Sequence, residues 1–388
     1  MNLERHFQNC DDFAAAARRR LPRIFADYID GGAFAEKTMQ RNRSDFDRWA
    51  LRQRVLLPLD TPDLSVPLGQ TRAALPFGPA PVGFLGLYRR DGDIAVARAA
   101  AQAGTPFALS TFSINGPATI AAACGTAPDF QLYLDTDPVV NAAYLGQCRA
   151  TGVRRIFLTV DTAITSVRER DVRNGFRSLD RITPALLWQF ALRPRWAFDI
   201  LRGGSHEVEL VRGRPEFGKG VLAQAGHLSR RLDKNLTWDV VARLRAAWDG
   251  ELIVKGISAP EDALMAAAAG VDGIVLSNHG GRQLDESCST VGQIAAVRAA
   301  LGPSLRLYVD SGFRRGTDII KALALGADFI LLGRPFAWAV AARGEGGAAH
   351  LIALLRQEIE RSLCLMGISS IEELKARGPE VLMPTGSV

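Results

Sequence analysis

Short apolar runs alternate with longer helical stretches along most of the chain. Eight of these runs are apolar at consecutive positions and bounded by turn residues, as strands buried on both faces are. They span residues 77–83, 106–111, 130–134, 155–161, 251–256, 273–278, 306–312 and 329–335. Alanine- and leucine-rich segments such as 93–104, 260–270 and 317–327 lie between them, and several end in glycine, a common helix stop.

This alternation predicts the fold class. Eight strand–helix units in sequence favour an α/β protein with a closed (β/α)8 TIM barrel over an open doubly wound sheet. We expect a single domain over residues 1–388, with a helical extension at 1–76 that folds across one barrel mouth and an insertion at 162–236 after strand four. In such barrels, functional residues lie at the carboxyl ends of the strands.

The middle of the insertion mixes large apolar residues with arginines. It reads TPALLWQFALRPRWAFDILRGG, and a segment of this composition could lie on a membrane surface through residues 180–204. The alternative is a lid or a packed helix of a soluble protein, which is the commoner use of such a segment.

Composition and charge narrow the function classes. The net charge of +6 comes almost entirely from arginine, which pairs with carboxylates and phosphates. No dense basic run carries interleaved aromatics, so we expect no nucleic-acid partner. The five cysteines lack metal-type spacing, which predicts free thiols in a reducing compartment and no metal site. The charged first twenty residues and the lack of a membrane-spanning stretch predict a cytoplasmic protein, with attachment to the inner face of a membrane left open.

Ionisable residues follow the fourth, fifth and sixth strands. Asp161 ends strand four and Lys255 ends strand five, while the run after strand six contains His279 and Arg282. A histidine oriented by a carboxylate suits proton abstraction from a substrate that arginine holds. The alternative is that His279 and Asp161 are only structural partners.

The last two strands end in glycine–arginine sequences. They supply Gly312, Arg314, Gly333 and Arg334. Glycine lets backbone N–H groups approach an anion, and the loops after strands seven and eight are the usual phosphate site of this barrel. Two such sequences at neighbouring strand ends predict a phosphate-bearing cofactor or substrate.

Several separated motifs carry a family resemblance. SNHGGRQLD at 277–285, together with LPRIFADYIDGGA, FQLYL, LTVD and DSGFRRG in the same order, resembles the FMN-dependent 2-hydroxy acid oxidase and dehydrogenase family. That family includes glycolate oxidase, L-lactate dehydrogenase and mandelate dehydrogenase. The resemblance covers roughly residues 4–370 and is strongest toward mandelate and lactate dehydrogenases.

The resemblance implies a role for each matching residue. His279 would take a proton from the substrate alcohol or α-carbon, and Asp161 would stabilise the resulting imidazolium. Arg168 and Arg282 would hold the substrate carboxylate. The remaining contacts to the substrate would come from Tyr28 and from Tyr133, the latter through the substrate hydroxyl. The residues implied around FMN are Val82, Gly83, Ser110, Gln131, Thr159, Lys255, Ser277, Asp310, Gly312, Arg314, Gly333 and Arg334.

The implied reaction is oxidation of an L-2-hydroxy acid to the 2-oxo acid. Its electron acceptor stays open among oxygen, a quinone and another carrier. Gly83 favours a dehydrogenase, because oxidases of the family tend to carry alanine there. Members often form homo-tetramers. The alternative is an FMN barrel that acts on another hydroxylated substrate, such as a modified peptide. One departure from the family pattern is that Ala163 and Ser166 replace a common proline and glycine before Arg168.

Overall fold

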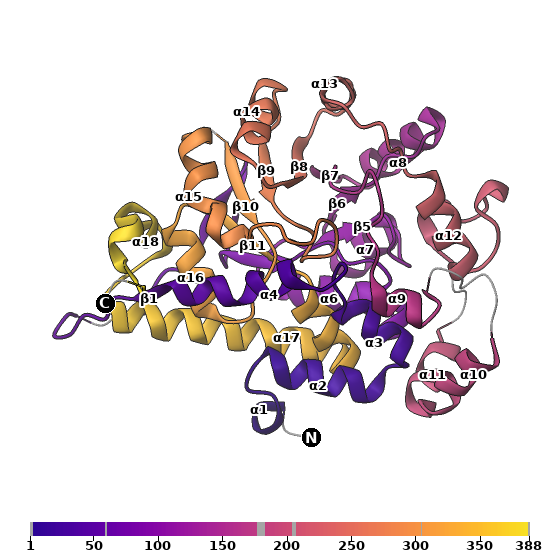
Figure 1. Ribbon diagram of the computed structural model, residues 1–388, viewed down its shortest axis with the longest axis horizontal. Coiled ribbons are helices and arrows are strands. Elements are labelled where there is room, and N and C mark those ends of the chain that lie inside the picture. Colours follow the sequence, from indigo (N-terminus) through magenta and orange to yellow (C-terminus); the bar gives the residue numbers. More distant parts are fainter. Residues whose placement is uncertain (1–2, 59, 177–182, 204–206, 304, 387–388) are drawn as a thin grey trace.

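The computed structural model describes residues 3–58, 60–176, 183–203, 207–303 and 305–386 (Figure 1). In this part of the chain, eight parallel strands form the central sheet, in the order β4-β11-β10-β9-β8-β7-β6-β5. The strands are β4 (Phe77–Pro79), β5 (Ala108–Ser110), β6 (Asp129–Leu132), β7 (Arg155–Thr159), β8 (Glu251–Ile257), β9 (Gly273–Leu276), β10 (Arg306–Val309) and β11 (Phe329–Leu332). The predicted α/β barrel and all eight of its strands are confirmed.

The two ends of this strand order meet at β4 and β5. The hydroxyl of Thr105, just before β5, donates to the carbonyl of Phe77 in β4. A Cβ on Gly78 would lie 2.7 Å from the carbonyl oxygen of Pro106, so glycine is required for this close approach. The ring therefore closes through a side-chain bond and close packing at this seam.

Helices cover the outside of the ring, and one or more follow each strand. They are α5 (Leu85–Tyr88), α6 (Gly92–Gln102), α7 (Pro117–Cys124), α8 (Pro138–Ala150), α13 (Trp238–Ala247), α14 (Pro260–Ala268), α15 (Thr290–Leu301), α16 (Gly316–Ala324) and α17 (Arg334–Met366). Their apolar faces pack on the strands; α16, for example, buries Ile319, Ile320 and Leu323 completely. This packing buries an apolar surface large enough to dominate the stability of the fold.

The amino-terminal extension covers parts of both barrel ends. It begins with α1 (Leu3–His6), α2 (Cys10–Arg20), α3 (Arg23–Asp30) and α4 (Lys37–Ser44). The carbonyl of Ile29 in α3 accepts a hydrogen bond from Arg334, which follows β11, so this part reaches the carboxyl ends of the strands.

The later part of the extension forms strands. The hairpin of β2 (Val66–Leu68) and β3 (Thr71–Ala73) lies at the amino ends, where the carbonyl of Leu68 accepts from Arg155. A third short strand, β1 (Trp49–Leu51), pairs with β12 (Leu382–Pro384) near the carboxyl terminus. The predicted helical extension is confirmed, and these strands were not predicted.

The insertion after β7 consists of short helices. They are α9 (Glu169–Arg173), α10 (Pro184–Ala191), α11 (Pro194–Leu201), the 3-10 turns Glu209–Val211 and Pro215–Phe217, and α12 (Val221–Arg231). Residues 180–182 and 204 of the segment predicted to contact a membrane lie outside the described residues. Among the helices that the structure describes, none combines the length and apolarity needed to cross a bilayer.

Candidate active site

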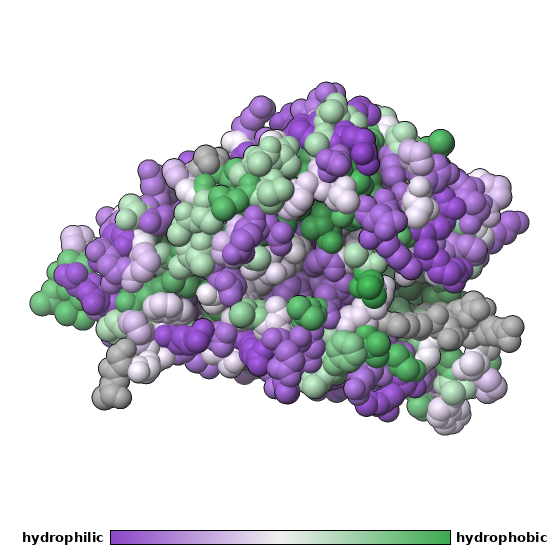
Figure 2. Space-filling model, turned by 45° about the horizontal axis from the view of Figure 1, so that its top comes forward, coloured by the Kyte–Doolittle hydropathy of each residue, from purple (hydrophilic) through white to green (hydrophobic). Residues whose placement is uncertain are grey.

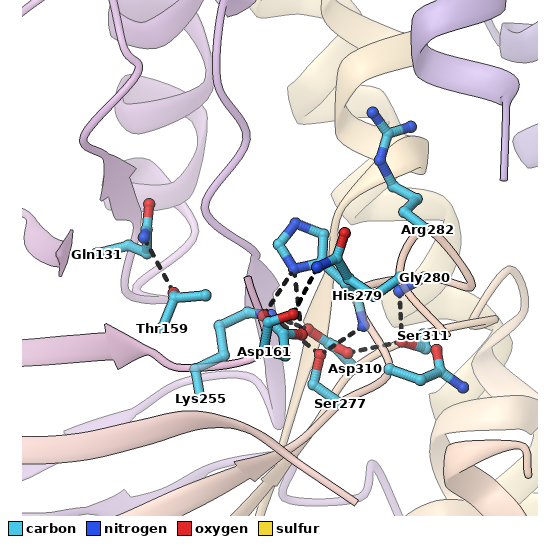
Figure 3. Close-up of polar contacts among 12 residues, drawn as sticks. Gln131, Thr159, Asp161, Lys255, Ser277, His279, Gly280, Arg282, Asp310 and Ser311 are labelled. Carbon is cyan, nitrogen blue, oxygen red and sulfur yellow. Dashed lines mark hydrogen bonds and ion pairs between the residues drawn. The ribbon is translucent and has the colours of Figure 1, made fainter. Parts of the chain in front are cut away.

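A histidine–aspartate pair lies at the carboxyl ends of β7 and β9 (Figure 3). Nδ1 of His279 is 3.0 and 3.2 Å from the two carboxylate oxygens of Asp161. His279 has a φ of +57°, a left-handed conformation that is uncommon outside glycine and asparagine. The hydroxyls of Ser277 and Ser311 accept the backbone N–H groups of His279 and Gly280, at 3.1 and 3.0 Å, and hold this turn. The ring is therefore fixed against the carboxylate.

Burial and neighbouring charges set the protonation states of this pair. Burial lowers the pKa of His279 below its usual value, and the cations Lys255 and Arg168 lower it further, although Asp161 opposes them. Burial also disfavours the charged form of Asp161, but contact with His279 and the charge of Lys255 outweigh it and lower the pKa of this carboxyl. The pair is thus a neutral imidazole beside an ionised carboxylate near pH 7, with Nε2 available as a base.

Lys255 is a buried cation at the end of β8. Its Nζ is 2.9 Å from the carboxylate of Asp310 and donates to the hydroxyl of Ser277 at 3.0 Å. Burial disfavours the ammonium, but Asp310 and Asp161 outweigh it and raise the pKa of Lys255. A fixed positive charge therefore lies within the same cluster as the histidine (Figure 3).

A buried polar chain crosses the ends of β5, β6 and β7. The hydroxyl of Ser110 donates to Oε1 of Gln131 at 3.0 Å, and Nε2 of Gln131 donates to Thr159 at 2.9 Å. All three side chains are buried. Burying three polar side chains costs free energy that apolar side chains would not cost, so packing alone does not explain them. Together they offer hydrogen-bond donors and acceptors to a flat polar ring of a bound ligand.

Two arginines lie around the ring of Tyr28. Arg282 donates to the carbonyls of Tyr28 and Gly31 at 2.6 and 3.1 Å, and its guanidinium carbon is 4.7 Å from the centre of the tyrosine ring. That of Arg168 is 5.9 Å from the same centre. Burial lowers the pKa of Arg168, and repulsion from Arg282 lowers it further. An anion between the two guanidinium groups would relieve this repulsion. Although Ala163 and Ser166 depart from the family pattern, Arg168 still lies at the ring of Tyr28.

Five aromatic side chains form a continuous wall beside these arginines. Tyr28 stacks on Phe176 with ring centres 4.1 Å apart and meets Phe84 edge-on at 6.1 Å. Phe84 meets Phe112 at 5.6 Å, and Phe112 meets Tyr133 at 5.5 Å. Burial raises the pKa of Tyr133, so its hydroxyl stays protonated and can donate a hydrogen bond. We call these five residues the aromatic wall.

The residues predicted to hold a phosphate include two partly buried arginines. Arg314 donates to the carbonyl of Phe313 at 2.7 Å and lies over the ring of Trp338. Arg334 donates to three backbone carbonyls at 2.8–2.9 Å, those of Ile29, Gly31 and Gly280. Within the described residues, neither guanidinium has an ion pair with a carboxylate, which is unusual for an arginine withdrawn from solvent.

These arginines fit the phosphate of FMN. Burial lowers the pKa of Arg314 to about 10, and burial with repulsion from Arg282 and Arg314 lowers that of Arg334 well below its ordinary value. A phosphate dianion would supply the missing negative charge, and Arg334 also begins α17, where the helix dipole favours anions. The uncompensated charge is thus the observation that supports a phosphate here.

Gly83, Gly312 and Gly333, which are predicted to lie at the cofactor, differ in how closely neighbouring atoms approach them. Gly312 has a φ of +94°, and a Cβ there would lie 1.9 Å from the carbonyl oxygen of Asn42 in α4, so packing alone requires glycine. A Cβ on Gly83 would lie 2.9 Å from Cβ of Phe112. One on Gly333 would lie 3.8 Å from Val82, which places the ends of β11 and β4 side by side.

Sequence reasoning missed the contributions of α4 and of three aromatic residues. Asn42 and Asn278 exchange two amide hydrogen bonds, each of 2.8 Å, which tie α4 to the turn that carries His279. Phe84 and Phe176 join the aromatic wall, although neither was among the predicted site residues. Phe112 was not among the predicted site residues either, although its contacts with Phe84 and Tyr133 make it part of the wall.

Comparison with known proteins agrees with this geometry. Residues 17–380 match the family model described as FMN-dependent dehydrogenase. L-lactate dehydrogenase of Caulobacter vibrioides strain NA1000 / CB15N is 42% identical over 366 residues, covering 94% of this chain and 95% of that protein. L-lactate dehydrogenase of Pseudomonas aeruginosa strain LESB58 is 40% identical over 369 residues, covering 94% and 96%.

Solved structures show the same relationship. The monotopic membrane protein (S)-mandelate dehydrogenase superposes with a TM-score of 0.90 at 35% identity, covering 97% of this chain and 99% of that one. Mandelate oxidase superposes with a TM-score of 0.81 at 34% identity, covering 97% of both chains. With the matched motifs and the barrel, these similarities show that the chain belongs to the FMN-dependent dehydrogenase family and that FMN is its cofactor.

Proposed function

We propose that the protein oxidises an L-2-hydroxy acid to the corresponding 2-oxo acid. The observation that carries the proposal is the neutral His279, held by the ionised Asp161 in one cluster with Lys255, together with two partly buried arginines, Arg168 and Arg282. A base, a carboxylate clamp and a redox cofactor are the three components that this oxidation needs. The lactate and mandelate dehydrogenases among its relatives act on substrates of this class, as their names state.

His279 is the base of this proposal. Because its Nδ1–H points to Asp161, its Nε2 carries the lone pair that accepts the substrate proton. That proton comes from the hydroxyl or from the α-carbon, depending on whether the carbon loses hydride or is first deprotonated. In both routes Asp161 stabilises the imidazolium that forms, so the carboxylate lowers the barrier electrostatically.

Arg168 and Arg282 hold the substrate carboxylate. Each guanidinium lies beside Tyr28, whose hydroxyl adds a third donor, and a carboxylate would offset the repulsion between the two cations. The protonated hydroxyl of Tyr133 hydrogen-bonds the substrate oxygen as it becomes a carbonyl. These contacts fix the α-carbon and its hydrogen relative to His279.

When bound, FMN would supply the two-electron acceptor that oxidation of the substrate carbon needs. Lys255, held by Asp310 and Ser277, would face the N1–O2 edge of the ring, where its charge favours the anionic reduced form. Gln131, Thr159, Ser110 and the backbone of Val82 and Gly83 would line the ring, and Asp310 would bind the ribityl chain. The phosphate would be held by Gly312, Arg314, Gly333 and Arg334.

The acceptor of those electrons is proposed to be a quinone or another carrier rather than oxygen. Gly83 is the feature that favours a dehydrogenase over an oxidase, and one structural relative is a monotopic membrane protein. We propose that α10 and α11 contact a membrane surface, since they expose Leu187, Trp188, Phe198 and Leu201. At the lower right of Figure 2, in the region where Figure 1 draws these helices, hydrophobic residues reach the surface among polar ones.

An anaerobic titration tests the proposal. The purified yellow protein should be bleached by at least one acid of a panel that contains L-lactate, glycolate and (S)-mandelate, and a quinone should restore the colour faster than air does. A flavin that no member of the panel bleaches would favour the alternative, an FMN enzyme for another hydroxylated substrate such as a modified peptide. If air alone reoxidises the flavin rapidly, the protein is an oxidase and not a dehydrogenase.

A further inference from the structure

A basic cavity lies outside the candidate active site, where the carboxyl half of α2, the start of α11 and α17 meet. It has a volume of about 590 Å³, and no residue of the candidate active site lines it. Its walls carry five arginines and a histidine: Arg19, Arg20, Arg193, Arg195, Arg343 and His6. Asp12 is the one carboxylate among its described lining residues, and its side chain accepts the backbone N–H of Gln8. The cavity is therefore strongly positive.

Three of the arginines have structural partners, and one of them is Arg343, whose guanidinium carbon lies 5.5 Å from the centre of the Phe7 ring. Arg20 contacts Asp199 at 2.8 Å, and Arg193 donates to the carbonyl of Leu21 at 3.0 Å. Arg20 nevertheless has a buried Nε without a hydrogen-bond partner in the described residues. Arg19 and Arg195 are exposed, and no described residue forms an ion pair or hydrogen bond with either guanidinium. Donors are thus left over on three of the five arginines.

Helix electrostatics explain only part of this arrangement. Arg19 and Arg20 lie in the last turn of α2, where cations interact favourably with the helix dipole. Arg193 and Arg195 lie at the opposite kind of helix end, the amino-terminal turn of α11, where the dipole disfavours cations and favours anions. Burial lowers the pKa of Arg20, and repulsion from Arg89 and Arg195 lowers it further. The fold thus gathers charge here that its own carboxylates do not neutralise.

We propose that this cavity binds the phosphate headgroup of an anionic phospholipid. Arginine forks match phosphate oxygens in pairs, and a cavity of about 590 Å³ is large enough for a glycerophosphate rather than a single small anion. The inference rests on the membrane contact proposed above and adds to it a specific lipid site.

The apolar surface beside the cavity is the reason for choosing a lipid. Leu192 lines the cavity and is itself 52% exposed. On α11, Phe198 and Leu201 follow Arg195 at intervals of three residues, which puts all three on one helix face, and they are 57% and 79% exposed. Trp188 on α10 is 66% exposed. An apolar face bordered by arginines and a tryptophan is the pattern of a helix lying in a lipid headgroup layer.

Vesicle sedimentation with the full-length, FMN-loaded protein tests this site. Phosphatidylglycerol vesicles should bind the protein more tightly than phosphatidylcholine vesicles do. The double variant Arg19→Gln/Arg195→Gln should lower binding to phosphatidylglycerol by about tenfold or more. The matched control Arg154→Gln/Arg243→Gln removes the same charge from exposed positions at β7 and α13, across the molecule from α2 and α11 (Figure 1), and should bind normally.

A conservative variant separates recognition from general attraction. Arg19→Lys/Arg195→Lys keeps both charges but loses the forks, so it should bind less tightly than the wild type. Binding equal to the wild type would overturn a built headgroup site while leaving the membrane contact intact. Equal weakening by the matched control would overturn it as well, because total charge alone would then govern binding.

Two further outcomes identify the source of the phosphate. Glycerol 3-phosphate should compete with vesicles for the wild-type protein and have no effect on the glutamine variant. If the protein binds glycerol 3-phosphate but no vesicle, the proposal of a lipid ligand is wrong, and the ligand is a soluble phosphate compound. Flavin bleaching by hydroxy acids should be unchanged in all the arginine variants, so failure of the lipid site is distinguishable from failure of the proposed oxidation.

Discussion

At the amino ends of the strands, Arg155 is held between two carboxylates, whereas Arg314 and Arg334 at the carboxyl ends form no ion pair with any carboxylate that the structure describes. Arg155 is 2.9 Å from Asp129 and 2.7 Å from Glu251, which begin β6 and β8. Burial disfavours its charge, but those two carboxylates and Tyr308 outweigh it and raise the pKa of Arg155. At the other end, burial and mutual repulsion lower the pKa values of Arg314 and Arg334.

This difference supports the proposal that the carboxyl ends of the strands carry the function. A buried charge with internal partners is complete in the folded protein and contributes to structure. A buried charge without them is stable only with a ligand, and perturbed pKa values gather at such sites. The hairpin of β2 and β3 also covers the amino ends, since the carbonyl of Leu68 accepts from Arg155, and no comparable strand covers His279 in the described chain.

Of the changes considered, Asp161→Asn should lower kcat/KM the most, and it should leave stability unchanged. The amide can neither stabilise the imidazolium nor enforce the right tautomer of His279, so kcat/KM should fall by about 10²- to 10⁴-fold. Steady-state kinetics with the best substrate of the panel would measure it. The matched variant Asp129→Asn, at the amino end, should lower the melting temperature and leave kcat within twofold; loss of kcat there would break the contrast.

Arg155→Met should produce the reverse result. Removing the cation leaves Asp129 and Glu251 buried without their main partner, which costs about 3–5 kcal/mol of unfolding free energy. Denaturant unfolding would measure this loss, and kcat per bound FMN should not change. Arg154→Met, one residue earlier and exposed, is the control and should stay within about 0.5 kcal/mol of the wild type. A large loss in that control would mean that the network is not the cause.

Arg282→Lys should have an intermediate effect. Lysine keeps the charge but loses the fork, so the KM for a hydroxy acid should rise by about 10- to 100-fold while FMN content and melting temperature stay unchanged. An unaltered KM would contradict the carboxylate clamp and favour the alternative substrate class. If the variant instead loses FMN, Arg282 contacts the cofactor rather than the substrate carboxylate.

The pH profile should show the smallest effect. Because burial lowers the pKa of His279 below 6.5, kcat/KM should be constant from neutral pH down to about 6.5 and fall only below it, as the imidazole gains a proton. The same shift makes protonation favour the unfolded chain, so His279 lowers stability as the pH falls from 6.5 through the folded pKa. A kcat/KM that already falls between pH 8 and 7 would contradict this assignment.

The barrel and most of the site were predictable from local patterns. The eight apolar runs mark strands because both faces are buried, and the rule for strand ends then located His279, Asp161 and Lys255. The predicted runs extend past the strands, as at 306–312 against Arg306–Val309. The reason is that the backbone turns at Ser311 and Gly312, whose φ values are +77° and +94°, while the residue types still resemble a strand.

Contacts between distant segments were not predictable. The Asn42–Asn278 pair joins residues 236 positions apart, and neither asparagine stands in a pattern that indicates the other. The same holds for the aromatic wall, in which Phe176 stacks on Tyr28, and for the cavity between α2 and α11. Such arrangements follow from tertiary packing, whereas periodicity reports only on neighbours along the chain.

The extension also has a consequence for biosynthesis. The carbonyl of Ile29 and the guanidinium of Arg334 are 305 positions apart, although they share one hydrogen bond at the barrel mouth. At a synthesis rate of about 5–20 residues per second, the ribosome needs roughly 15–60 seconds to make the intervening chain. During that time Ile24, Phe25 and Ile29 of α3 have no barrel to pack against. The nascent amino terminus should therefore be a target for chaperones until the last strand emerges.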